Sequence, residues 1–160
     1  MGGVEYWNTI FSFRDKESGE ETTVSMPEQR GSTVIPADPP VPGAVFTVGW
    51  DVEGQRYALF RIEVALMKGS GYVVTGSLGS GMKQAVRTAY DYLRSNLNRF
   101  TIDRSLDDLQ AHFQVVNLMQ AKEGSQTASA FFVALFSALV DKPVRAATVV
   151  LGEITIQGAV

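Results

Sequence analysis

One short stretch groups the residue types that hydrolytic chemistry uses. It reads A-K-E-G-S-Q-T-A from Ala121 to Ala128 and directly precedes a strongly apolar segment. A serine at the start of a helix, as expected for Ser125, lies in the positive field of the helix dipole, and Lys122 or another amine could act as its base. The same hydroxyl could instead accept a backbone N–H as a helix cap, worth about 1 kcal/mol. Capping serines far outnumber catalytic ones, so these residues by themselves favour the cap.

Other candidate groups are few. His112 is the only imidazole, so any Ser-His-Asp scheme must include it, yet it lies in an alternating strand-like stretch, and Ser125 lies beyond the end of that stretch. A hydrogen-bonded or surface strand histidine is the better prediction. Two pairs of adjacent carboxylates, Asp107-Asp108 and Glu20-Glu21, are expected to point apart into solvent on loops. They predict neither a metal site nor a glycosidase site.

A glycine-rich turn, G-S-L-G-S-G-M-K-Q from Gly76 to Gln84, suggests a phosphate loop, because such turns present backbone N–H groups to anions. The spacing reaches Gly81, but Met82-Lys83 follows where Lys-Ser or Lys-Thr is needed. No hydroxyl is left for magnesium. The turn is therefore predicted to lead from a strand into a helix without binding a nucleotide.

Composition narrows the class of protein. The chain has 160 residues, of which 45% are hydrophobic and 19% charged, as in a one-domain globular protein. A net charge of -3 argues against a general basic surface for nucleic acid, although a local basic face remains open. The absence of cysteine excludes thiol nucleophiles, disulfides and zinc-cysteine sites, and it fits a cytoplasmic protein.

No membrane segment is predicted. The longest apolar run, Ala128 to Val140, has about 13 residues, whereas a spanning helix needs roughly 20. The N-terminus lacks the basic start and the cleavage site of a secretory signal.

The Pro-rich string V-I-P-A-D-P-P-V-P-G divides the chain. We expect an N-terminal arm over residues 1–33, a connector over residues 34–43 and a main domain over residues 44–160. The arm is expected to form a β-hairpin. A lone hairpin is marginally stable, so this one should pack on the main domain or on sequence outside the chain.

The main domain alternates between strand and helix patterns. An amphipathic helix is predicted over 80–100, and a helix that is apolar nearly all round, and hence buried, over 127–140. Phe131, Leu135 and Leu139 should face the sheet. Strands are predicted over 44–52, 55–67, 72–78, 111–119, 146–152 and 153–158. This order predicts an α+β fold, with two main helices packed on a mixed sheet.

Several strings in these elements resemble one family. The string T-G-S-L-G-S-G-M, from Thr75, resembles the T-G-x-L-G-x-x-M segment of the proteolytic domain of Lon-type ATP-dependent proteases. The strings D-K-P-V-R, from Asp141, and L-G-E-I-T, from Leu151, are similar to its N-x-P-V-R and T-G-E-I-T. More narrowly, residues 88–100, 114–128 and 149–158 resemble the Lon-like protein of bacterial BREX phage-defence systems. The resemblance covers the chain from Ala44 and implies the Lon proteolytic-domain sandwich.

The same resemblance implies a depleted catalytic site. Lon proteases use a serine that is activated by a lysine, a Ser-Lys dyad, and the serine lies in the motif K-D-G-P-S-A-G. Aligned without gaps, this motif begins at Lys122, and its nucleophile falls on Gln126, an amide that cannot attack a carbonyl usefully. The threonine that supports the dyad falls on Leu151. The dyad lysine is expected roughly fifteen residues or more past the second motif, beyond Val160, so the domain is expected to be incomplete at its C-terminus.

The leading expectation is a catalytically silent Lon-like domain that serves assembly or scaffolding in a phage-defence AAA+ protein. The alternative is a peptidase in which Ser125 attacks and the base is a lysine outside this chain or, less plausibly, Lys122. No cofactor or metal is expected in this domain. For the full-length protein the resemblance implies ATP and Mg²⁺, a ring-shaped homo-oligomer and engagement of DNA. If the chain ends at Val160, apolar surface should be exposed there and lead to self-association.

Overall fold

The computed structural model describes residues 10–14, 21–25, 35–76, 78–100, 104–121 and 123–159. The chain divides into two compact units, Met1–Pro36 and Ala37–Val160. In the first unit, β1 (Ile10–Arg14) pairs antiparallel with β2 (Glu21–Ser25). All other elements belong to the second unit.

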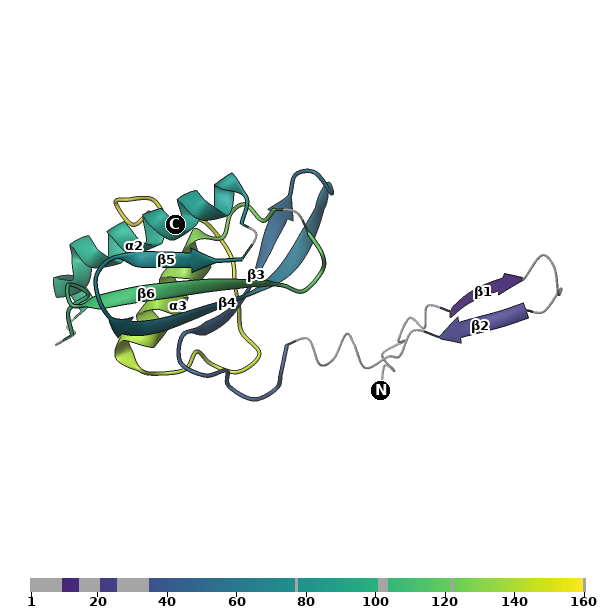
Figure 1. Ribbon diagram of the computed structural model, residues 1–160, viewed down its shortest axis with the longest axis horizontal. Coiled ribbons are helices and arrows are strands. Elements are labelled where there is room, and N and C mark those ends of the chain that lie inside the picture. Colours follow the sequence, from purple (N-terminus) through teal and green to yellow (C-terminus); the bar gives the residue numbers. More distant parts are fainter. Residues whose placement is uncertain are drawn as a thin grey trace. The chain divides into compact units, whose positions relative to one another are not determined.

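The second unit is built on one mixed five-stranded sheet with the order β5-β6-β4-β3-β7 (Figure 1). Three neighbouring strands are antiparallel, and the short strands at the two edges are parallel to their neighbours. The bounds are β3 Ala44–Asp51, β4 Arg56–Lys68, β5 Tyr72–Thr75, β6 Leu109–Asn117 and β7 Val149–Val150. The two longest strands, β4 and β6, are neighbours within the sheet.

Two helices supply the rest of the core. They are α2 (Ser80–Asn96), continued by the 3-10 turn η1 (Leu97–Phe100), and α3 (Ala128–Val140). The helices contact each other, and α3 packs on β3 and β4, behind the sheet in the view of Figure 1. Every second residue of β4 is buried in this layer, as expected for a strand with one covered face. The buried side chains of β4 are Ala58, Phe60, Ile62 and Val64.

The two helices bury the faces that their patterns predict. The stripe of α2 is Met82, Ala85, Val86, Ala89, Tyr90 and Leu93. In α3, Phe131, Leu135 and Leu139 are each 0% exposed, as predicted. The predicted α+β fold with two main helices on a mixed sheet is confirmed. No helix among the described residues is both long and apolar enough to cross a membrane.

The predicted last strand over 153–158 is wrong. The backbone there turns back on itself: Thr155 N–H donates to the carbonyl of Ala159 at 2.9 Å. The start of the segment is held by α3, because the hydroxyl of Ser129 donates to the carbonyl of Glu153 at 3.1 Å. These local bonds satisfy groups that a ladder would otherwise use, so the alternating Ile-Thr-Ile pattern does not form a strand here.

Candidate functional site

The segment between β6 and α3 carries the residues that the sequence singles out, and it lies against β3. Ser125 N–H donates to the carbonyl of Trp50 at 3.1 Å, and Trp50 N–H donates to the carbonyl of Ser125 at 3.3 Å. The Ser125 hydroxyl also donates to the Trp50 carbonyl, at 3.3 Å. Ser125 is thus an antiparallel partner of β3, half-buried, with its Oγ within reach of the strand backbone.

The expected capping role of Ser125 is therefore wrong. Helix α3 begins at Ala128 after the N-cap residue Thr127, and no capping side-chain hydrogen bond is formed there. The Thr127 hydroxyl instead donates to the carbonyl of Gly124 at 3.4 Å. Ser125 lies before the N-cap residue Thr127. Its backbone N–H and carbonyl are bonded to Trp50 instead.

A glycine lets this segment approach the core. A Cβ at Gly124 would lie 2.5 Å from Cε2 of Phe60 and 2.7 Å from Cε of Met82. A Cβ at Gly49 of β3 would lie 2.7 Å from the Cα of Gly124. All three distances are shorter than real Cβ contacts, so two facing glycines are needed for the segment to pass over β3.

The glycine-rich turn before α2 binds a carboxylate of the same chain. The backbone N–H of Gly81 donates to Oε1 of Glu123 at 2.7 Å. A Cβ at Gly79 would lie 2.5 Å from Cδ of Glu123, so the missing side chain makes room for the carboxylate. The resemblance to an anion-binding loop thus has a physical basis. In this structure the anion is Glu123.

Gln126 is the residue on which the motif alignment of the sequence analysis places the nucleophile. Its backbone is left-handed, with a φ of 64°, and its side chain is exposed. It borders two cavities. The first, of about 730 Å³, lies among α2, Ser125 and the 153–159 segment, and the second, of about 570 Å³, is lined by residues such as Tyr57 and Leu151. Gln126 therefore separates two open hollows at the start of α3.

The described lining of these hollows supplies hydrogen-bonding groups and one carboxylate, Glu153, but no amine and no imidazole. Among the described residues, no lysine and no histidine lines either cavity. The polar side chains of the first are Gln84, Thr88, Ser125, Gln126, Glu153, Thr155 and Gln157. Leu151, on which the motif alignment places the family's threonine, is 62% exposed beside the second cavity. Lys122 lies outside the described residues.

His112 is held elsewhere on the sheet. It lies in β6, opposite Ala65 of β4, and its Nε2 is 2.9 Å from Oε1 of Gln110. The cavity that it lines includes neither Ser125 nor Gln126. The structure thus does not form a Ser-His pair in the part of the chain that it describes.

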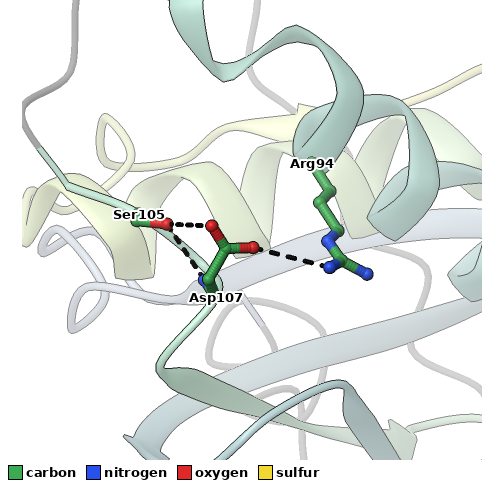
Figure 2. Close-up of polar contacts among 3 residues, drawn as sticks. All are labelled: Arg94, Ser105 and Asp107. Atoms are coloured by element: carbon green, nitrogen blue, oxygen red, sulfur yellow. Dashed lines mark hydrogen bonds and ion pairs between the residues drawn. The ribbon is translucent and has the colours of Figure 1, made fainter.

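Among the described residues, Asp107 and Asp108 belong to no group of metal-ligating side chains. Asp107 accepts a hydrogen bond from the Ser105 hydroxyl at 2.9 Å and lies 3.5 Å from a guanidinium nitrogen of Arg94 (Figure 2). Asp107 therefore stabilises a turn beside α2. The Glu20-Glu21 pair falls at the edge of the described residues. No group of three or more metal-ligating side chains occurs within the described ranges.

Comparison with known proteins places this geometry in a family. Residues 35–160 match the family described as Lon protease (S16) C-terminal proteolytic domain. The chain belongs to this family. The predicted resemblance to the Lon proteolytic domain is therefore confirmed.

Two of the most similar relatives bear the name Lon-like protease BrxL. The protein from Escherichia coli O9:H4 (strain HS) is 38% identical over 162 residues, and that from Bacillus cereus (strain H3081.97) is 32% identical over 164 residues. Each alignment covers 100% of this chain but 23% and 24% of the relative. The Lon protease of Desulfatibacillum aliphaticivorans is 39% identical over 101 residues, 62% of this chain and 12% of that protein. The chain thus spans about a quarter of the length of the BrxL relatives.

Two site residues were not anticipated. Glu123 is a ligand of the glycine-rich turn, and Trp50 pairs with Ser125. A carboxylate next to Gly124 and a turn of the type G-S-G before a helix were both visible in the sequence. Their contact joins residues 42 positions apart, which local pattern reasoning does not reach.

Proposed function

We propose that this chain is a catalytically silent Lon-like domain that serves assembly or scaffolding within a larger phage-defence AAA+ protein. The observation that carries the proposal is the exposed Gln126 at the nucleophile's place. An amide nitrogen is not a useful nucleophile toward a carbonyl, and the described lining of the two hollows adds no amine or imidazole to activate a neighbouring hydroxyl.

The segment around Gln126 is held by several contacts with the rest of the domain. Facing glycines, the Glu123 bond to α2 and the Ser125 bridge to β3 all hold the segment in place. The segment thus keeps a defined conformation although an amide stands where the reactive residue is expected. This combination supports a structural role for the domain. In the whole protein we propose a cytoplasmic homo-oligomeric ring, in which ATP and Mg²⁺ are bound by the ATPase part.

One observation favours a second candidate, an ATP-dependent serine peptidase. Ser125 is half-buried and lines the first hollow, so its hydroxyl lies beside the space where a peptide could bind. In that version the base is a lysine outside this chain or Lys122. Against it, the Ser125 hydroxyl already donates to the Trp50 carbonyl.

The test uses casein cleavage and a fluorophosphonate probe. The purified chain, and the full-length protein with ATP and Mg²⁺, should neither cleave casein nor be labelled, and Ser125→Ala should behave as wild type does. Cleavage or labelling that Ser125→Ala abolishes would overturn the silent-domain proposal and establish the peptidase. A known serine peptidase in parallel shows that the probe is active.

A further inference from the structure

The sulfur of Met119 replaces a backbone carbonyl as a hydrogen-bond acceptor of the sheet. The N–H of Leu59, on β4, donates to Sδ of Met119 at 3.3 Å. The carbonyl of Leu59 accepts the N–H of Leu118 at 3.1 Å. In an antiparallel ladder, two opposite residues exchange both of their bonds through the backbone. Directly after β6 ends at Asn117, one of these two bonds is therefore made by a thioether.

The turn around Met119 holds this sulfur against β4. The N–H of Met119 donates to Oδ1 of Asn117 at 3.1 Å, and the same oxygen accepts the N–H of Ala121, also at 3.1 Å. A guanidinium nitrogen of Arg56 donates to the carbonyl of Met119 at 2.9 Å. Met119 nevertheless remains 46% exposed. Its position thus depends on hydrogen bonds and not on burial.

Exposure opens this sulfur to oxidants. The chain contains no cysteine, so its sulfur chemistry falls to methionine. Among the described methionines, Met119 is 46% and Met67 44% exposed, whereas Met82 is 2% exposed in the core. Susceptibility to oxidation rises with exposure. Of these three residues, Met119 is the one whose sulfur accepts a hydrogen bond from the sheet.

Oxidation changes what this sulfur can bind. A thioether is a weak acceptor, and its conversion to a sulfoxide turns a flexible apolar side chain into a polar and chiral one. The added oxygen is bonded through a lone pair of the sulfur. Because Met119 is exposed, this polar oxygen can be hydrated only if the side chain turns away from β4. The N–H of Leu59 then loses its acceptor.

We propose that Met119 is an oxidation site, and that its sulfoxide opens the end of the β4–β6 ladder. The oxidant is a peroxide or a hypohalous acid. With hydrogen peroxide, a sulfur lone pair attacks one oxygen, the O–O bond breaks, and the departing hydroxide takes the proton of the transferred oxygen to give water. The sulfur is oxidised and the peroxide reduced by the same electron pair. A methionine sulfoxide reductase reverses the change. The inference does not depend on whether the site at Gln126 is silent.

Peroxide treatment of the isotope-labelled chain, followed by NMR, tests the proposal. Mass spectrometry of proteolytic peptides should find Met119 and Met67 oxidised and Met82 unchanged. The amide signal of Leu59 should shift, and its hydrogen exchange should become faster by about threefold to tenfold, because one hydrogen bond is lost. A methionine sulfoxide reductase should restore the original signal. Met119 that stays reduced while Met67 is oxidised, or an unchanged Leu59 signal in the oxidised chain, would overturn the proposal.

Two leucine variants assign the effect to one sulfur. Met67→Leu removes the other exposed sulfur and should respond to peroxide as the wild type does. In Met119→Leu the Leu59 amide should exchange fast before any treatment, and peroxide should leave it unchanged. A peroxide-induced shift that persists in Met119→Leu, or that disappears in Met67→Leu, would assign the effect to another methionine and contradict the proposal. The dispersion of the amide signals confirms that both variants are folded.

Discussion

Oε1 of Glu123 lies 2.7 Å from the backbone nitrogen of Gly81 and accepts its N–H, so the segment that holds Gln126 is fastened to the first turn of α2. The first N–H groups of a helix have no partner within the helix, and a carboxylate there is also favoured by the helix dipole. One side chain thus satisfies a helix terminus and fixes a neighbouring loop.

Replacement of Glu123 should measure this link. We expect Glu123→Ala to lower the free energy of unfolding by about 1–2 kcal/mol, because a charge-assisted hydrogen bond at a partly exposed helix terminus is lost. Glu123→Gln keeps an acceptor without the charge and should lose less. Urea denaturation of the three proteins gives the values, and an alanine variant as stable as wild type would show that the bond contributes nothing.

Gly79 provides the control for this prediction. Because its added Cβ would meet Cδ of Glu123 at 2.5 Å, Gly79→Ala should displace the carboxylate and destabilise the protein. In the Glu123→Ala background the same change should cost much less. A double-mutant cycle with no coupling between the two positions would mean that the glycine is required for another reason.

Gly124→Ala should be the most damaging glycine replacement near the site. Its Cβ would overlap the ring of Phe60 and the methyl group of Met82 in the core. Overpacking of this kind costs about 1–3 kcal/mol. Ser125→Ala, one residue on, removes only one hydroxyl contact and should cost less than about 1 kcal/mol. Thermal or urea denaturation compares the two. Similar losses would contradict the close approach to the core.

Helix α3 should carry a large part of the core. Phe131→Ala, Leu135→Ala or Leu139→Ala is expected to cost roughly 2–5 kcal/mol each, since all three side chains are fully buried. Val133→Ala, at a half-buried position of the same helix, serves as the control and should cost less. Losses below about half a kcal/mol at all three positions would show that the buried face is assigned wrongly.

High pH should weaken the fold through Tyr90. Burial raises the pKa of its hydroxyl above the ordinary value of 10.0, and the nearby Arg94 guanidinium opposes this only in part. The unfolded chain therefore releases the proton first, so stability is fully present below about pH 10 and is lost as the pH rises through the folded pKa. Urea denaturation between pH 8 and 11 should show a shallower decline for Tyr90→Phe. Equal slopes in the two proteins would contradict the shift.

Local patterns predicted most of the fold because its elements are regular. The stripe from Met82 to Leu93 has helical spacing, and the alternation along β4 matches the pleat. The pattern failed over 153–158, where Thr155 and Ser129 satisfy the backbone by contacts that no periodicity encodes. One turn hydrogen bond and one tertiary hydrogen bond therefore hold that segment.

The sequence singled out the residues of the candidate site but not the contacts that hold them. The aligned motifs singled out Ser125 and Gln126, and in the structure both residues line the first hollow. The capping role failed because Ser125 pairs with Trp50, a residue 75 positions away. The partner of the glycine-rich turn was missed for the same reason, since Glu123 and Gly81 meet only after the sheet and helices have packed.

A serine at position 126 tests whether a hydroxyl there is the only catalytic group that the site lacks, or one of several. We expect Gln126→Ser in this chain to remain unlabelled by a fluorophosphonate probe, because a serine without a general base is a weak nucleophile and no lysine or histidine lines the described walls of either hollow. Gln126→Ala, which adds no hydroxyl, is the matched control. Labelling of the serine variant alone would reveal a base near position 126, and Gln126 by itself would then account for the inactivity that we propose.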